Sequence, residues 1–367
     1  MSLPNHGIRV IDVLRDPQRA SGLSESQWSE LVAQARGANL LGALGARLKA
    51  AGLQAPGPAN RHLAGALQLS ERQHRSVRWE IYQLQEALGH LDIPVLLLKG
   101  AAYVMAEHTV GQGRLFGDID ILVPHAALGD VESQLMLHGW VSAKTSAYDQ
   151  RYYREWMHEI PPMSHMRRGT VLDVHHTILP LTSRNAPDPQ QIIDRATALP
   201  TAGLSAIRIP CPEDLVIHSI THLVHEGELH NGLRDLNDID CMLRSFGAAP
   251  GFWKRLSAYA GGNDLARPVC FGLHLVRSIY GTPVPESTLA ELSPNGRAQQ
   301  PARWLEATYA LALQPVGHAE RRITTALALW LLYVRSHALR MPIHQLVPHL
   351  ARKAWMQRFP AKGQGEK

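Results

Sequence analysis

The sequence predicts an α+β protein in which a small core, built from a mixed sheet and helices, is flanked by N-terminal helices and a larger C-terminal helical region. Three observations predict this class. Helical periodicity fills the first 90 residues, short apolar runs alternate with helical segments over about residues 90–180, and helical periodicity resumes at Pro212. We therefore expect an N-terminal helical region at 1–90, a core at 91–205 and a C-terminal helical domain at 206–367.

Two helical segments are expected in the N-terminal region. Residues 22–53 carry apolar side chains at helical spacing, and Ser24 or Ser26 is the candidate N-cap. The proline- and glycine-containing stretch 54–59 breaks this pattern. A second long helix is then predicted from about Arg61 to Leu91.

The core begins where the periodicity changes. Residues 93–98 form a short, almost wholly apolar run, which is typical of a strand buried on both faces. An alanine-rich helix over 101–108 leads to a second strand at 118–123, and another helix is expected over 126–137. The order strand, helix, strand, helix indicates one small α/β or α+β unit.

A hairpin is expected to complete this unit. The runs 160–166 and 170–176 flank Arg167-Arg168-Gly169, where the glycine suits a positive φ. In the second run, Asp173 and His175 lie two residues apart and therefore share one face of the strand. The C-terminal region then opens at Pro212-Glu213-Asp214, because a proline and two acids favour the first turn of a helix.

Composition limits the classes of function. The formal net charge of +5 suits an anionic ligand but is too small to argue for nucleic-acid binding. The widely spaced cysteines form no CxxC pair and the N-terminus lacks an apolar leader run, so a cytoplasmic protein is expected. The most apolar stretch, Ile323 to Val334, is shorter than the ~20 residues that span a bilayer and is interpreted as a buried helix, so no membrane partner is expected.

Two acids on the second predicted strand are the main candidates for chemistry. Asp118 and Asp120 lie two residues apart, so a strand points both carboxylates to one face. Adjacent carboxylates repel and are costly to bury unpaired, whereas Mg²⁺ or Mn²⁺ would neutralise them. Asp173 is the best candidate for a third acid on a neighbouring strand. The alternative is that Asp118 and Asp120 are solvated acids at a strand end.

The order of several motifs resembles the uncharacterised nucleotidyltransferase family of the polymerase-β-type superfamily. The resemblance covers about residues 90–280. It rests on Leu96-Leu-Leu-Lys-Gly100, Arg114, Asp118-Ile-Asp-Ile-Leu-Val123, Leu172-Asp-Val-His-His176, Glu213-Asp-Leu-Val-Ile-His-Ser-Ile-Thr-His222 and Leu233-Arg-Asp-Leu-Asn-Asp238. It implies a polymerase-β-like nucleotidyltransferase core at 91–205 in which Asp118 and Asp120 bind the metal ions. Asp173 would be the third ligand, and could also act as the base for the acceptor hydroxyl.

The same resemblance assigns the nucleotide-binding residues. Gly100 falls where the superfamily has a Gly-Ser or Gly-Gly turn that admits the triphosphate, but Ala101 follows it here. Lys99 and Arg114 could supply the positive charge instead, and His175 could hydrogen-bond a carboxylate or the nucleotide. The alternative for Lys99 is a residue at the strand end whose ammonium group is solvated. The alternative for Arg114 is a structural ion pair with Asp118.

Two further clusters are interpreted as structural. His218, His222 and His225 share one helical face, a geometry that permits metal binding, but no cysteine or carboxylate spacing supports a zinc site. Packing against the core, and hydrogen bonding near the acceptor site, are the favoured roles. Asp238 and Asp240 repeat the Asp-Ile-Asp pattern on a predicted helix, where residues two apart point in different directions and cannot share a metal.

The expected function is a metal-dependent nucleotidyltransferase. It would move a nucleoside monophosphate from an NTP such as ATP to an unidentified acceptor hydroxyl or phosphate and release pyrophosphate. The acceptor could be a small molecule, a peptide or protein, or RNA. Two alternatives remain open, which are a non-catalytic nucleotide-binding module and a phosphoryl or pyrophosphoryl transferase on the same scaffold. Hydrolase, P-loop and dinucleotide-binding signatures do not occur in the sequence.

Overall fold

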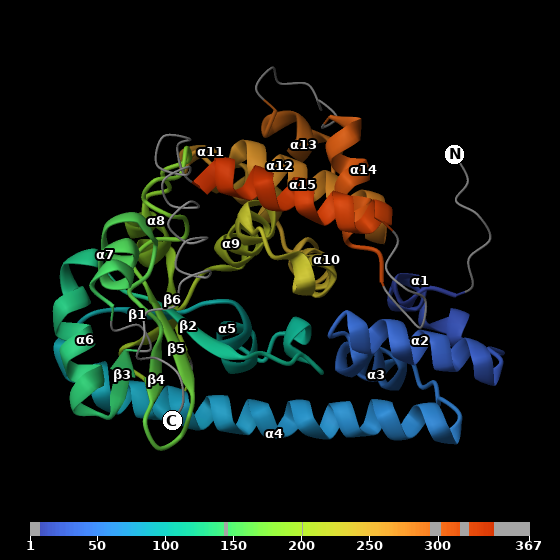
Figure 1. The fold of residues 1–367 in the computed structure, drawn as a ribbon, viewed down its shortest axis with the longest axis horizontal. Coiled ribbons are helices and arrows are strands. Elements are labelled where there is room, and N and C mark those ends of the chain that lie inside the picture. The colour runs from blue at the N-terminus through green and yellow to red at the C-terminus, as the bar shows by residue number, and fades with distance from the viewer. Residues whose placement is uncertain (1–7, 143–145, 200, 294–301, 316–322, 341–367) are drawn as a thin grey trace, which may run out of the picture.

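A seven-stranded mixed sheet and the helices around it make up the fold (Figure 1). The computed structural model describes residues 8–142, 146–199, 201–293, 302–315 and 323–340. Within these residues the sheet is confined to the middle of the chain, and helices precede and follow it. The predicted α+β class is therefore confirmed.

Four helices precede the sheet. They are α1 (Val10–Arg15), α2 (Glu25–Gly37), α3 (Leu41–Ala50) and α4 (Gly57–Leu88). The segment predicted as one helix over 22–53 is thus divided in two, because Asn39 adopts a positive φ of 56° that an α-helix cannot continue through. Ser24 caps α2 through a capping box with Gln27, as its position indicated.

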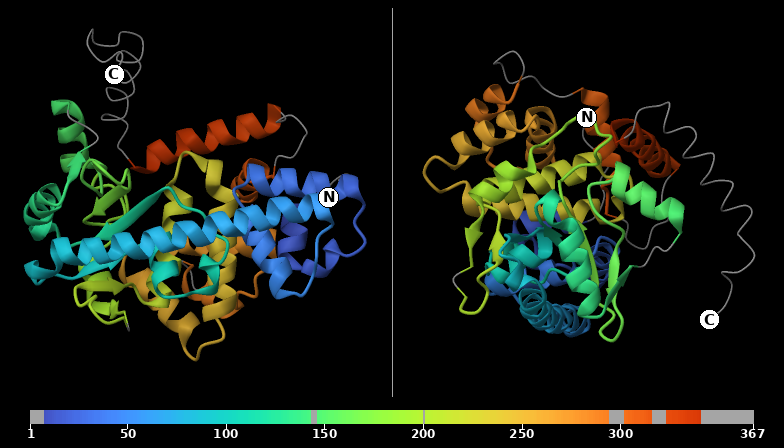
Figure 2. Two further views of the ribbon diagram at one scale, coloured as in Figure 1. Left: turned by 90° about the horizontal axis from the view of Figure 1, so that it is seen from below. Right: turned by 90° about the vertical axis from the view of Figure 1, so that its left-hand side faces the viewer.

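The long helix α4 connects the two ends of the molecule. It packs against α3 near one end and against α5 (Lys99–Met105) and α6 (Leu128–Leu137) towards the other. Figure 2 shows it crossing from the N-terminal helices to the sheet. It therefore fixes the core relative to the N-terminal helices.

The sheet brings strands together in an order that differs from their order in the chain. It runs β3-β4-β5-β2-β1-β7-β6. The strands are β1 (Val95–Leu97), β2 (Asp118–Leu122), β3 (Trp140–Ser142), β4 (Met163–His165), β5 (Val171–His175), β6 (Thr197–Ala198) and β7 (Ile207–Ile209). β1 is antiparallel to β2, whereas β2 and β5 run parallel. The predicted hairpin is confirmed as the antiparallel pair β4–β5, and Gly169 between them has a φ of +69°.

The central strands are buried because their residues are almost all apolar. Every residue of β1 is inaccessible to solvent, in agreement with a strand covered on both faces. β2 is buried from Ile119 onward, while Asp118 at its start is exposed. The remaining helices of this part are α7 (Ala147–Trp156) and α8 (Pro189–Arg195).

Helices after the sheet form a second layer above it. They are α9 (Pro212–His225), α10 (Gly232–Phe246), α11 (Phe252–Gly262), α12 (Ala266–Tyr280), α13 (Glu286–Glu291), α14 (Arg303–Ala312) and α15 (Ile323–Arg340). α9 packs against α10, α11 and α12, and it starts at Pro212 as predicted. No described helix is long and apolar enough to cross a membrane.

One continuous apolar cluster links all three parts of the chain. It includes side chains from α1 to α4, from the central strands, and from the helices after residue 210. The proposed boundaries at residues 90 and 205 remain predictions. Parts of the predicted 206–367 region, at 294–301, 316–322 and 341–367, lie outside the described residues.

Candidate active site

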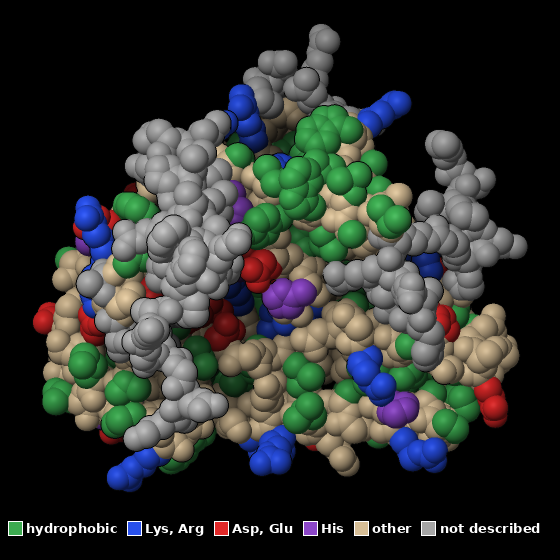
Figure 3. All heavy atoms as spheres, in the orientation of Figure 1, with side chains coloured by type: hydrophobic (Ala, Val, Ile, Leu, Met, Phe, Trp, Pro, Cys, Tyr) green, Lys and Arg blue, Asp and Glu red, His purple; other side chains and the backbone are tan. Residues whose placement is uncertain are grey.

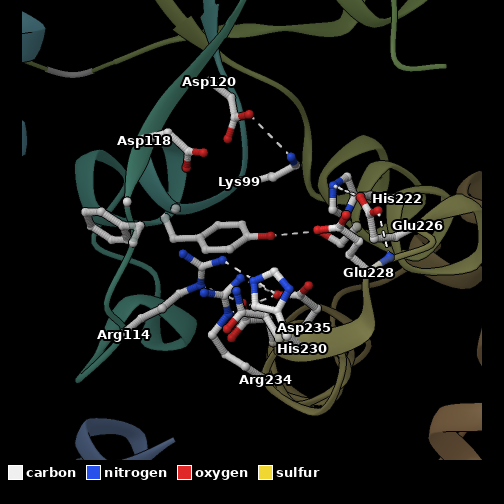
Figure 4. A pocket seen from close by; sticks show the side chains of 17 residues that line it. Lys99, Arg114, Asp118, Asp120, His222, Glu226, Glu228, His230, Arg234 and Asp235 are labelled. Carbon is white, nitrogen blue, oxygen red and sulfur yellow. Dashed lines mark hydrogen bonds and ion pairs between the residues drawn. The ribbon is translucent and has the colours of Figure 1, made fainter. Parts of the chain in front are cut away.

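A cavity of about 390 Å³ opens between the start of β2, helix α5 and the helices α9 and α10. Figure 3 shows acidic, basic and histidine side chains gathered at the hollow near the middle of one face. Figure 4 shows how the charged side chains point into the cavity from both sides. The wall includes Lys99, Gly100, Tyr103, Arg114, Asp118, Asp120, His222, Glu226, Glu228, His230, Arg234, Asp235 and Asp238. Five of the seven predicted site residues thus line one cavity, and the other two, Asp173 and His175, lie on β5.

The two acids of β2 lie in different environments. Asp118 is exposed at the start of the strand, whereas Asp120 is buried with 7% of its surface accessible. Burial by itself would raise the pKa of Asp120, but the nearby Lys99 and His175 hold that pKa well below its usual range. Although part of its side chain is exposed, protein atoms around the carboxyl group of Asp118 displace water from it, and this desolvation and the charge of Asp120 raise its pKa. The buried acid therefore stays ionised beside a carboxyl group that is harder to ionise.

Asp173 lies directly opposite Asp120 on the neighbouring parallel strand. Burial, followed by the charges of Glu159 and Asp120, raises the pKa of Asp173 to about 8. Its Oδ1 atom is buried without a hydrogen-bond partner among the described residues. The sheet thus brings together the three predicted ligands, although Asp173 is not part of the cavity wall.

These carboxylates fit a divalent cation. A buried carboxylate oxygen without a donor is costly, and three neighbouring acids repel one another. Hard cations such as Mg²⁺ take oxygen ligands of this kind and would offset both costs. The donor set of Asp118, Asp120 and Asp173 is therefore chemically suited to such an ion.

His175 connects the acids of the sheet to a residue that the sequence did not indicate. Its Nε2 atom lies 3.2 Å from Asp120 Oδ1 and 3.4 Å from Glu159 Oε2. Glu159 reaches this position through an isolated bridge to His175. The β4–β5 register would place Ile160 opposite His175, so the bridge is displaced by one residue. A pattern of alternation cannot foresee such a shift, although the His158-Glu159 pair just before the hairpin was a possible signal.

Lys99 and Gly100 open helix α5 at the edge of the cavity. Lys99 has a φ of +43°, and its Nζ atom lies 3.3 Å from Asp120 Oδ1. A Cβ atom on Gly100 would lie 2.6 Å from Arg114 Nη1 and 2.7 Å from a ring carbon of Phe116. The absence of a side chain at Gly100 therefore lets Arg114 and Phe116 pack closely against α5.

Arg114 is buried in the wall of the cavity, where it pairs with Asp238. Its Nε atom lies 2.6 Å from Asp238 Oδ2, and Asp235 lies 4.0 Å from another guanidinium nitrogen. The guanidinium also lies over the rings of Tyr103 and Phe116, at 5.5 and 5.7 Å from their centres. Its carboxylate partner is thus Asp238 of α10 and not Asp118. Asp238 takes no part in a shared metal site with Asp240, which pairs with Arg244.

The family model of the uncharacterised nucleotidyltransferases matches residues 24–281, which is more than half of the chain. This chain belongs to that family. It is also similar to the solved structure of an antigenic nucleotidyltransferase-like protein from Paracoccidioides brasiliensis, with 15% sequence identity and a TM-score of 0.29, over 53% of this chain and 91% of that chain. No curated protein matches the chain.

The three histidines of α9 that the sequence placed on one face have separate environments. Burial, with the charges of Lys99 and His175, lowers the pKa of His218 to about 3. His222 lines the cavity and lies 3.5 Å from Glu226. The ring of His225 hydrogen-bonds the carbonyl oxygen of Thr221 at 2.9 Å. Elsewhere, potential ligand atoms of His158, Glu159 and His175 lie within 4.8 Å of one another.

The candidate site carries both signs of charge around one cavity. The carboxylates of Asp118 and Asp120 line it, and so do the ammonium group of Lys99 and the guanidinium groups of Arg114 and Arg234. Such a site can hold a cation and an anionic substrate group next to each other. This is the arrangement that phosphoryl and nucleotidyl transfer require.

Proposed function

We propose that this chain transfers a nucleoside monophosphate from an NTP to an acceptor hydroxyl or phosphate and releases pyrophosphate. The reaction would take place in the cavity between β2, α5 and α10. The single observation that carries this proposal is the register of Asp120 against Asp173, with Asp118 on the same face of β2. Membership of the nucleotidyltransferase family supports the same reaction class.

Asp118, Asp120 and Asp173 would hold Mg²⁺ or Mn²⁺ in this proposal. A bound divalent ion supplies charge neutralisation at the phosphates and activates an oxygen nucleophile. Asp120 suits this role because its pKa is held well below the usual range, so it remains a carboxylate at neutral pH. Asp118 is exposed at the cavity, where it would offer a carboxylate oxygen to the ion.

The cations of the wall would orient the NTP. Lys99 lies beside Asp120 as a compact point charge, and Arg114 presents a planar fork whose Nε end is fixed by Asp238. Because Asp238 occupies only part of the five-donor guanidinium, the remaining donors of Arg114 can bond phosphate oxygens. Catalysis would thus depend on positioning and on electrostatic stabilisation, with no covalent step on the protein.

The acceptor would bind on the side of the cavity formed by α9 and α10. That side carries His222, Glu226, Glu228 and His230. Burial and the charge of Lys99 hold the pKa of His222 well below its usual range, so its ring is neutral and can accept a hydrogen bond from an acceptor hydroxyl.

The test is product analysis with NTPs labelled at the α or the γ phosphate. The protein and Mg²⁺ would be incubated with each NTP and with small-molecule, RNA and protein fractions of a cell extract. Label from the α position in the acceptor, with a mass gain of one nucleotide, is the expected result. Label from the γ position would indicate phosphoryl transfer, and nucleotide binding without any mass gain would indicate a binding module.

A matched pair of variants makes the test specific. Asp118→Asn should abolish the mass gain because it removes a proposed metal ligand. Asp130→Asn removes an equally exposed acid on α6, away from the cavity, and should leave the mass gain unchanged. Equal product from Asp118→Asn and the unmodified protein would contradict the proposal.

A further inference from the structure

Two histidines and a glutamate gather beside the acids of the candidate active site. One potential ligand atom from each of His158, Glu159 and His175 lies within 4.8 Å of the other two. Glu159 Oε2 is 3.4 Å from His175 Nε2 and 4.0 Å from His158 Nε2. The rings of His158 and His175 are tilted, with their centres 5.0 Å apart. The three side chains therefore converge on one point.

Main-chain hydrogen bonds hold these residues in place. The N–H of His176 donates to the carbonyl of His158 at 2.9 Å, and the N–H of Ile160 donates to the carbonyl of Val174 at 3.0 Å. These bonds lie on either side of Glu159, which itself bridges to His175. Because both segments are fixed, the convergence does not depend on flexible loops and is organised before any ligand binds.

A proton on His175 Nε2 cannot satisfy both of the carboxylates that approach this nitrogen. His175 Nε2 faces Glu159 and also Asp120, whose Oδ1 lies 3.2 Å away. A ring nitrogen carries at most one hydrogen, so it can donate a full hydrogen bond to only one of the two carboxylates. His175 is only 3% exposed, which leaves little access for a compensating water. A cation at this point would bind both the ring nitrogen and the carboxylate oxygens.

The local charge favours the same conclusion. Four carboxylates lie along this part of the sheet. Among the described ion pairs, they have one lysine partner and no arginine partner. The acids are Asp118, Asp120, Glu159 and Asp173, and the lysine is Lys99. An ion bound by oxygen ligands alone would not involve His158, whose Nε2 atom lies 4.0 Å from Glu159 Oε2.

We propose that His158, Glu159 and His175 form a binding site for a divalent transition-metal ion such as Zn²⁺. Two imidazoles and one carboxylate are the ligands that zinc accepts in catalytic sites, with a further position left open. Mg²⁺ prefers oxygen ligands and is a poor match for this set. The inference goes beyond the proposed function because it adds a second site for a different class of metal. Asp120 lies next to this second site, 3.2 Å from His175 Nε2.

The test measures metal content and does not depend on activity. The purified protein would be stripped with a chelator and dialysed against Zn²⁺ in an excess of Mg²⁺, which would occupy a site made of oxygen ligands. One equivalent of Zn²⁺ retained per chain is the expected result. Zn²⁺ lost to millimolar Mg²⁺, or no stoichiometric Zn²⁺ at all, would overturn the proposal in favour of a simple N–H group at His175 Nε2 that hydrogen-bonds one of the two carboxylates, Asp120 or Glu159.

Variants separate this site from the acids of β2. His158→Gln and Glu159→Gln should weaken Zn²⁺ binding by at least about 10- to 100-fold, the range that even outer partners of a metal site contribute. The control His176→Gln changes a neighbouring histidine whose ring packs on His125, and it should retain Zn²⁺. Asp118→Asn should retain it too. Unchanged binding in His158→Gln would contradict the site.

A measurement on the unmodified protein covers the case in which a variant fails to fold. Replacement of Zn²⁺ by Co²⁺ should give intense visible absorption bands of the kind that four- or five-coordinate sites with nitrogen ligands produce. X-ray absorption at the zinc edge should show scattering from two imidazole rings. Weak bands typical of six oxygen ligands, or no imidazole scattering, would overturn the proposal.

Discussion

Arg114 and Asp238 form a buried ion pair that joins the segment before β2 to helix α10. Arg114 Nε lies 2.6 Å from Asp238 Oδ2, and each side chain is only 6% exposed. The two residues are 124 positions apart in the chain. Because both also line the cavity, this pair connects the sheet to the C-terminal helices at the point where substrate would bind.

Asp238→Asn should lower the free energy of unfolding by about 3 kcal/mol, because it removes the counter-charge that lies nearest to the buried guanidinium of Arg114. Urea unfolding followed by circular dichroism would measure the loss. The control is Asp235→Asn, which changes an acid 4.0 Å from Arg114 that has its own partner in Arg234 at 2.7 Å. We expect a much smaller loss there, and equal losses in both variants would argue against the structural importance of the pair.

Gly100→Ala should reduce both stability and NTP binding. The new Cβ atom would displace Arg114 and Phe116, at a cost of about 1–3 kcal/mol for an overpacked position. Gly65→Ala is the matched control, since Gly65 also lies within a helix but has open space at its Cβ position. That variant should instead gain about 0.5–1 kcal/mol from higher helix propensity. Thermal melts and NTP titrations of both proteins would decide between these outcomes.

Asp118→Asn should lose activity without losing stability. In the metal-free protein, desolvation and repulsion from Asp120 raise the pKa of Asp118, so the neutral amide should keep or raise the melting temperature. The rate of nucleotide transfer should nevertheless fall by about 100-fold or more. A fall in melting temperature that accounted for the loss of activity would point to a structural role for Asp118.

Burial makes His225 a source of acid sensitivity. Its pKa is lowered to about 4, because burial disfavours the charged ring more than the Thr221 carbonyl stabilises it. The unfolded chain binds a proton near pH 6.5, so stability is complete above that pH and decreases as the pH falls towards 4. At pH 5, the preference of the unfolded chain for the protonated ring of His225 should lower the free energy of unfolding by about 2 kcal/mol.

The His225→Gln variant tests this dependence, because glutamine does not titrate. Free energies of unfolding at pH 7.5 and pH 5 would be compared with those of the unmodified protein. Between pH 7.5 and pH 5, the free energy of unfolding of the variant should fall by about 2 kcal/mol less than that of the unmodified protein. An identical decrease in both proteins would show that His225 does not contribute to the acid sensitivity.

Much of the fold follows from local sequence patterns. The apolar run at 93–98, the hairpin with Gly169, and the helix start at Pro212 are all found where the patterns predict them. The division between α2 and α3 was not predicted, because apolar spacing continues across Asn39 and only the positive φ of that residue interrupts the helix. Local propensity describes which residues suit a helix, but not each point where the backbone must turn.

The candidate site was predicted only in part. Asp118 and Asp120 could be paired from their spacing along one strand, and Asp173 could be proposed from its own strand and the family resemblance. Glu159 was missed because its place depends on a bridge that is shifted by one residue from the hairpin register. The partner of Arg114 was missed because Asp238 lies on a helix far along the chain.

The sequence by itself determined the two carboxylates of β2, the strands that carry them and the family to which the chain belongs. The carboxylates and their strands depend on spacing within a few residues, which the periodicity of a strand converts directly into direction, whereas the family depends on the order of motifs along about residues 90–280. The tertiary structure decided which distant groups face those carboxylates. It brought Asp173 into register with Asp120, Glu159 to His175, and Asp238 to Arg114. Strand order and helix packing set these contacts, because they arise from burial of the whole apolar core and not from any local pattern.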